Sequence, residues 1–238
     1  MLPFLVYNLN RKTDEIEDAI NHSERYAFTK KYAKILFYLS LAAYAIAFFI
    51  AGMCGITAVA ITAIPLVSGI FYSIPLLPRG FKYRRLKDIP VVKNFIVGLA
   101  WAIPIALLPV VFTGFCAGRM TVAVGLFFFF FLSFVNSTVF DIRDVEGDAE
   151  SGVQTIPVII GIRSTRILLS VMNLISSVVV LVFCKGYLSP VETAIIAGIA
   201  IYVQGYIILF NGNKLNRIMY DLVADGQYLL LGGLICLS

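Results

Sequence analysis

Two groups of polar residues, far apart in the chain, are each spaced to form one stripe on a helix. The first group stands at positions i, i+4 and i+8 and the second at i, i+3 and i+7, both close to the helical period. Two carboxylates about 4 Å apart repel by roughly 4 kcal/mol at an effective dielectric constant near 20, so cations would have to neutralise such stripes. The groups are Asn10, Asp14 and Asp18, and Asp141, Asp144 and Asp148.

The side chains of both stripes offer only oxygen ligands, which favours a hard cation. Mg²⁺ typically takes one or two carboxylates, several waters and phosphate oxygens of a substrate. Two stripes that faced one another would therefore hold Mg²⁺ ions bridged by a diphosphate. The alternative is that the acidic residues are only solvated loop charges. Two stripes, each next to a strongly apolar stretch, make that alternative weaker than it would be for one isolated pair.

The elements that must position these stripes are apolar helices. Hydrophobic residues make up 60% of the 238-residue chain and charged residues only 14%, which is typical of an integral membrane protein. A helix needs about 20 apolar residues to cross a bilayer. We expect an all-α, polytopic bundle that forms one domain over residues 1–238. Seven stretches qualify as crossings: 33–52, 54–77, 94–112, 120–140, 166–184, 190–210 and 218–238.

The basic residues alternate between the connections that join these stretches. Among the 19 lysines and arginines, only Arg119 and Lys185 fall in the connections at 50–54, 113–119 and 185–189. This alternation follows the positive-inside rule, so we place the basic connections in the cytoplasm and do not expect nucleic acid as a partner. Four crossings separate segment 8–34 from segment 141–166. The two acidic stripes should therefore lie on the same, cytoplasmic face.

Other residues on that face could contact a substrate. Arg85 and Lys87 belong to a basic segment and are expected to bind diphosphate oxygens, with Lys93 a weaker candidate. Tyr72, at the cytoplasmic end of its stretch, could contact phosphate or a carbocation through its ring. The sequence also leaves open that it is an ordinary interfacial tyrosine.

The final stretch carries two carboxylates near its cytoplasmic start. Asp221 and Asp225 stand at i and i+4, and carboxylates in a membrane helix usually face a cavity or a partner. They are candidates for contact with substrate or acceptor, with a favourable interaction at the start of a helix as the alternative. Asn136, ahead of the second stripe, is expected to form an interhelical hydrogen bond.

The motifs resemble those of the UbiA superfamily of intramembrane prenyltransferases. The first stripe matches its N-x3-D-x3-D motif, and DIRDVEGDAESGVQTIPVIIG, from Asp141 to Gly161, matches its second motif and the run that follows. The stretch YSIPLLPRGFKYRRLKDIPVVKN, from Tyr72 to Asn94, resembles the family's middle segment. The resemblance covers essentially the whole chain, although few residues precede Asn10, where family members carry about two helices. We therefore expect a domain that is short at its N-terminus.

This resemblance implies a bundle of about nine helices around a lipid-open cavity. Two Mg²⁺ ions would ionise a prenyl diphosphate, and the carbocation would alkylate a lipid-soluble or aromatic acceptor among membrane lipids. The expected catalytic metal carriers are Asp14, Asp18, Asp144 and Asp148, with Asp141 also counted among the metal ligands and Asn10 supporting them.

Three other functions remain open at this stage. A transporter could use clustered carboxylates, but it would place them at mid-bilayer and in repeated halves. A phosphotransferase of the CDP-alcohol type also uses clustered aspartates, but its D-x2-D-G-x2-A-R signature is missing from the sequence. The chain could also be a truncated, non-catalytic relative.

Overall fold

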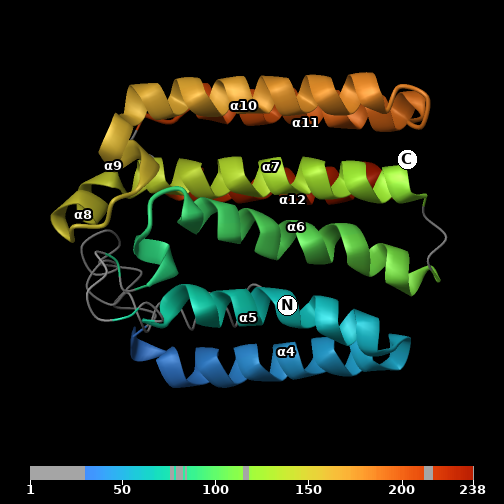
Figure 1. Ribbon diagram of the computed structural model, residues 1–238, viewed down its shortest axis with the longest axis horizontal. Helices are drawn as coiled ribbons and strands as arrows, with labels where there is room; N and C mark the ends of the chain where they lie inside the picture. The colour runs from blue at the N-terminus through green and yellow to red at the C-terminus, as the bar shows by residue number, and fades with distance from the viewer. Residues whose placement is uncertain are drawn as a thin grey trace.

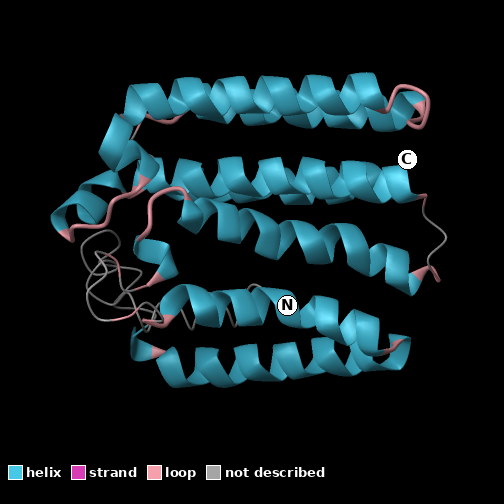
Figure 2. Ribbon diagram, viewed as in Figure 1, coloured by secondary structure: helices cyan, strands magenta, loops and turns pink. Residues whose placement is uncertain are grey.

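The computed structural model describes residues 30–75, 78, 83, 85–114, 118–211 and 217–237, and these residues form helices and connections without any strand (Figure 2). This confirms the expected all-α class. The helices, in chain order, are α4 (Ala33–Cys54), α5 (Ile56–Ser73), the 3-10 helix η1 (Leu86–Asp88), α6 (Val92–Phe112), α7 (Arg119–Arg143), α8 (Val145–Glu150), α9 (Ile156–Ile160), α10 (Ile162–Phe183), α11 (Pro190–Leu209) and α12 (Arg217–Leu237).

Six of these helices are long and apolar enough to cross a membrane, namely α4, α5, α6, α7, α10 and α11. The seventh predicted stretch also forms a long helix, α12, but it is not among the six. Most predicted boundaries differ from the observed helices by a few residues, and two of these differences bear on the site. Helix α5 ends at Ser73, two residues before Pro75, where a proline disfavours helical backbone. Helix α7 continues to Arg143, so Asp141 belongs to the helix itself.

The long helices lie side by side, and their connections gather at the two ends of the bundle (Figure 1). One end collects the starts of α4, α6, α10 and α12 together with α8, α9 and η1. Segment 141–162 therefore shares an end with segment 85–92, as the count of crossings predicts. Helix α7 is central, because it contacts α6, α10 and α12.

The outside of the bundle is apolar. Phe49, Met53 and Leu209 expose 73%, 76% and 73% of their surface, whereas buried polar groups lie between the helices. The hydroxyl of Tyr44 donates to the backbone oxygen of Thr62 at 2.7 Å, which joins α4 to α5. Such an exterior suits hydrocarbon rather than water as the surrounding medium, and interhelical hydrogen bonds then assist packing.

Helices α6 and α7 approach closely at Gly98. A Cβ atom there would lie 3.0 Å from Phe130 Cε2 and 3.3 Å from the Phe130 backbone oxygen. At Gly205, in α11, a Cβ would meet nothing within 4 Å. Of these two glycines, only Gly98 is therefore needed to let two helices approach closely.

We predict that Gly98→Val lowers the free energy of unfolding by about 1–3 kcal/mol more than Gly205→Val does, because only the first substitution overpacks an interface. Both variants add the same side chain to a helix, so the intrinsic helix propensity cancels. Titration of the purified protein with SDS in mixed micelles measures the difference. Equal losses in the two variants would contradict the packing role of Gly98.

Candidate functional site

The polar end of the bundle is organised by a buried ion pair between α6 and α7. Lys93 Nζ donates to Asp141 Oδ1 at 2.6 Å, and Asn94 Nδ2 donates to Asp141 Oδ2 at 2.8 Å. The Asn94 amide nitrogen also lies 3.1 Å from Thr138 Oγ1. Because Asp141 is only 3% exposed, it contributes a charge that α6 neutralises inside the protein.

The start of α6 supplies this cation for a reason visible in the sequence. Helix α6 begins with Val92, Lys93 and Asn94, ahead of a long apolar run. The lysine and the asparagine are adjacent in the chain and reach two oxygens of the same carboxylate. Sequence reasoning gave Lys93 only a weak role and missed Asn94. The signal available in the sequence was an asparagine next to a lysine at the start of a long apolar run.

Asp141 is the first aspartate of the second stripe, and the other two, Asp144 and Asp148, have different surroundings. Arg143 donates to both oxygens of Asp144, from Nε at 2.9 Å and from Nη2 at 2.5 Å. Asp148 is buried in α8, four residues after Asp144, with 7% of its surface exposed. The two carboxylates thus come from the end of α7 and from the short helix that follows it.

Arg143 also links this stripe to the last helix. Its Nη1 donates to Asp221 Oδ1 in α12, and its guanidinium carbon lies 4.7 Å from the ring centroid of Phe140. Sequence reasoning did not assign a role to Arg143. An arginine at the end of a membrane helix, between two aspartates, was nevertheless a visible signal.

Helices α7 and α12 share further polar contacts toward the middle of the bundle. Asn136 Nδ2 donates to Asp225 Oδ1 at 3.1 Å, which confirms the predicted interhelical hydrogen bond of Asn136. Deeper still, Ser133 Oγ and the Tyr228 hydroxyl lie 3.0 Å apart. We call these three interhelical contacts, Arg143–Asp221, Asn136–Asp225 and Ser133–Tyr228, the α7–α12 seam. Insertion of a carboxylate at mid-bilayer costs roughly 2.5–3.5 kcal/mol, so the two aspartates of the α7–α12 seam need polar partners.

The other predicted contact residues lie around η1. Arg85 pairs with Asp88 at 2.9 Å and Tyr72 lies half-buried near the end of α5. Lys87 is buried, and this burial lowers the pKa of its ammonium group to about 8, against the smaller effect of nearby Asp88. The segment therefore offers cations at the same end of the bundle as Asp144 and Asp148.

The first stripe cannot be located in the same way, since Asn10, Asp14 and Asp18 lie outside the described residues. Within the part of the chain that the structure describes, no three His, Cys, Asp or Glu side chains form a metal-binding group. Asp144 and Asp148 are nevertheless two carboxylates at one end of the bundle. Mg²⁺ needs only one or two carboxylates when a phosphate substrate completes its shell, so these donors fit the ion.

The sequence model of the UbiA prenyltransferase family matches residues 4–220, which is most of the chain. The chain belongs to the UbiA prenyltransferase family. Searches of curated proteins and of solved structures gave no significant match. Membership in this family, together with the six apolar helices, identifies an integral membrane protein of the prenyltransferase type.

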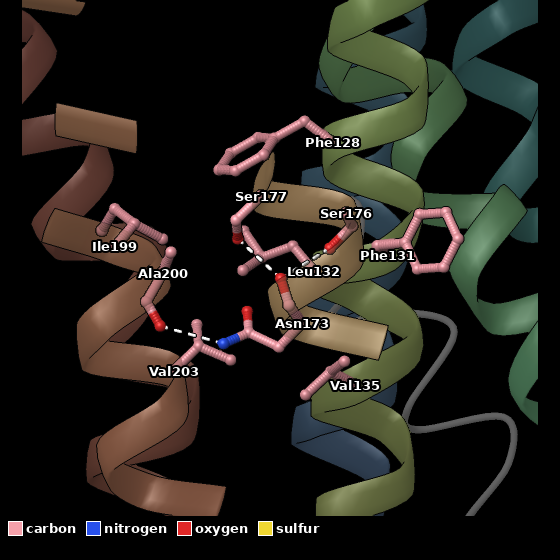
Figure 3. Close-up of a pocket in the computed structure, with 10 residues that line it drawn as sticks. All are labelled: Phe128, Phe131, Leu132, Val135, Asn173, Ser176, Ser177, Ile199, Ala200 and Val203. Carbon is pink, nitrogen blue, oxygen red and sulfur yellow. Dashed lines mark hydrogen bonds between the residues drawn. The ribbon is translucent and has the colours of Figure 1, made fainter. Parts of the chain in front are cut away.

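A small pocket of this UbiA-family protein lies away from the polar end, between α7, α10 and α11 (Figure 3). Val135 is its lining residue closest in sequence to Asp144, about 13 Å away along a helix with a rise of 1.5 Å per residue. Asn173 donates to the Ala200 backbone oxygen at 3.0 Å, and the Ser177 hydroxyl donates to the Asn173 backbone oxygen at 2.7 Å. The first of these hydrogen bonds joins α10 to α11, and the second joins two turns of α10. Because both serve the packing of helices, we do not assign the pocket to the reaction.

We predict that Lys93→Met destabilises the UbiA-family protein by about 3–5 kcal/mol, because it leaves the Asp141 carboxylate buried without its cation. The double variant Lys93→Met/Asp141→Leu should recover most of that loss. SDS titration of the four proteins of this double-mutant cycle measures the coupling. A double variant no more stable than Lys93→Met would show that the ion pair does not hold α6 against α7.

Proposed function

We propose that this protein transfers a prenyl group from a prenyl diphosphate to a lipid-soluble or aromatic acceptor within the membrane, with Mg²⁺ as cofactor. The observation that carries the proposal is the position of Asp144 and Asp148 in a UbiA-family chain. They lie at the end of the bundle that also holds Lys87 and Arg85. Carboxylates for the metal and cations for phosphate are thus on one side of an apolar bundle.

The proposed metal carriers are Asp144 and Asp148, together with Asp14 and Asp18 of the first stripe. When bound, Mg²⁺ would neutralise the charge that develops on the leaving diphosphate. Arg143 donates to both oxygens of Asp144 and so fixes the orientation of that carboxylate. An oriented carboxylate binds a metal with a smaller loss of side-chain entropy.

Asp141 is proposed to act as a support for this site. Both of its oxygens accept hydrogen bonds, from Lys93 and Asn94. These contacts fix the start of α6, and the short helix η1 with Lys87 directly precedes it. The sequence also predicts Asp141 as a metal ligand, and its partners favour the supporting role.

The rest of the bundle protects the reaction. An allylic carbocation reacts with water, so the acceptor must be alkylated where water is excluded. The six apolar helices supply such surroundings next to the polar end. By the positive-inside rule we place this end on the cytoplasmic side of the membrane, where a soluble diphosphate can be released.

Asp144→Asn tests the proposed metal site. The amide oxygen can still accept from Arg143, but it loses the charge that binds Mg²⁺, so we predict that turnover falls by about two orders of magnitude or more. Mg²⁺-dependent release of diphosphate from a panel of prenyl diphosphates is the measurement. Glu150→Gln, at an exposed carboxylate in the short helix α8 that follows Asp144, is the control and should keep its activity. Full activity in Asp144→Asn would refute the assignment.

Lys87 gives a test based on pH. With a pKa of about 8, its ammonium group is charged at pH 7 and neutral above pH 9. If it binds diphosphate, the Kd for a prenyl diphosphate should rise by up to about tenfold per pH unit above pH 8. Lys87→Arg should remove this dependence, since arginine keeps its charge throughout the range. A Kd that rises equally in both proteins would contradict the role of Lys87.

A further inference from the structure

The small pocket between α7, α10 and α11 has mainly apolar walls and one polar side (Figure 3). Its polar side belongs to α10, which contributes Asn173, Ser176 and Ser177. These three residues expose only 8%, 6% and 8% of their surface, so the rest of the protein covers them. Buried polar groups need hydrogen-bond partners, and the groups that remain available decide what the pocket can bind.

The side-chain amide of Asn173 has a fixed orientation. Its Nδ2 donates to the backbone oxygen of Ala200 at 3.0 Å and to Gln204 Oε1 at 3.2 Å. A rotated amide would place Oδ1 against the carbonyl oxygen of Ala200, and both atoms are acceptors. Gln204 is oriented in turn, because its own Nε2 donates to Ser170 Oγ at 2.8 Å. The nitrogen of the Asn173 amide therefore faces α11.

The oxygen of the same amide faces the pocket. In Figure 3 the side-chain oxygen of Asn173 points away from the dashed bond to Ala200, toward the middle of the labelled residues. Among the described residues, no group donates a hydrogen bond to this oxygen. A buried acceptor lowers the stability of a protein unless a donor reaches it. Asn173 thus offers an acceptor to a guest of the pocket.

The two serines offer acceptors as well. The hydroxyl of Ser177 donates to the backbone oxygen of Asn173 at 2.7 Å, and the hydroxyl of Ser176 donates to the same oxygen at 3.1 Å. A hydroxyl has one hydrogen and two lone pairs, so each serine keeps only the capacity to accept. The polar side of the pocket therefore consists of acceptors, and a guest must donate hydrogen bonds to it.

Size and charge select among the possible donors. The cavity volume is about 10 Å³, close to the smallest volume that holds one water molecule, roughly 10–15 Å³. None of the described residues that line the pocket is ionisable, so an ammonium ion would be buried there without a counter-charge, which is costly. Water is neutral, donates two hydrogen bonds and has the required size.

We propose that this pocket is a binding site for one water molecule, held by Asn173 Oδ1 and by the hydroxyl oxygen of Ser176 or Ser177. The water donates one hydrogen to the amide oxygen and the other to the serine. Helix α7 contributes only hydrocarbon to the pocket, as at Leu132 and Val135, so the water is bonded to α10 and enclosed by α7.

This inference goes beyond the proposed prenyl transfer and does not depend on it. It accounts for three polar side chains near the middle of α10, an otherwise apolar helix. Each of them has a partner in the protein for its hydrogens, and the water supplies the donor for the remaining oxygens. A buried water typically makes about three hydrogen bonds to such groups and is costly to remove.

The direct test is an experimental structure of the full chain in lipid nanodiscs, at a resolution that shows ordered waters. We expect one isolated density peak at about 2.5–3.0 Å from Asn173 Oδ1 and from one of the two serine hydroxyls. Absence of this peak in a map that shows other internal waters would overturn the inference. A peak that continues into a hydrocarbon chain would identify the hydroxyl of a lipid or detergent, and would overturn it as well.

The double variant Ser176→Ala/Ser177→Ala tests the assigned partners. It leaves the water one acceptor where two to four partners are usual, so we expect the peak to be lost. Alanine favours the helix, and the protein should still elute as wild type on gel filtration. The control is Ser164→Ala, the same substitution at an exposed position of α10, which should keep the peak. Retention of the peak in the double variant would refute the role of the serines and with it the proposed site.

Oxygen-17 magnetic relaxation dispersion, with the protein in water enriched in H₂¹⁷O, repeats the comparison in solution. It counts the water molecules that stay bound to the protein, and waters common to both proteins cancel in the difference. Wild type should hold about one such water more than the double variant, whereas Ser164→Ala should equal wild type. Equal counts in wild type and the double variant would contradict a water held by these serines.

Discussion

Lys93 and Asp141 place opposite charges next to each other at the end of an otherwise apolar bundle. Each charge alone would be costly to bury, and together, with Asn94 as a further donor, they satisfy one another. The contact joins the first turn of α6 to the last turns of α7. Because α8 follows α7 and η1 precedes α6, this contact helps to set the positions of Asp144 and Asp148 relative to Lys87.

The same requirement for polar partners shapes the α7–α12 seam. A charged or polar side chain inside a membrane must find a partner within the protein, and here Asp221, Asp225 and Tyr228 of α12 each find one on α7. Arg143 connects the two systems, since it contacts Asp144 at the end of α7 and Asp221 in α12. The end of α7 that carries the proposed metal site is therefore joined directly to α12 through one side chain.

The apolar helices have two roles that follow from the same composition. Their outward faces expose large side chains such as Phe49 and Leu209, which dissolve the protein in lipid. Their inward faces pack closely, as at Gly98 and Phe130, and leave little room for water. For the proposed prenyl transfer, which would pass through a carbocation, exclusion of water would protect the intermediate, and membrane solubility would give access to apolar substrates.

The sequence by itself determined the fold class, the number of long helices, the alternation of basic connections and the family. Each of these follows from local composition or from residues close together in the chain, where the helical period and the length of a crossing leave few choices. Only the tertiary structure decided the partners: that Asp141 is held by Lys93 and Asn94, and that Arg143 joins Asp144 to Asp221. These pairs depend on how α6 and α12 rotate and slide against α7. That packing is a property of whole helix surfaces, and no spacing within a single segment encodes it.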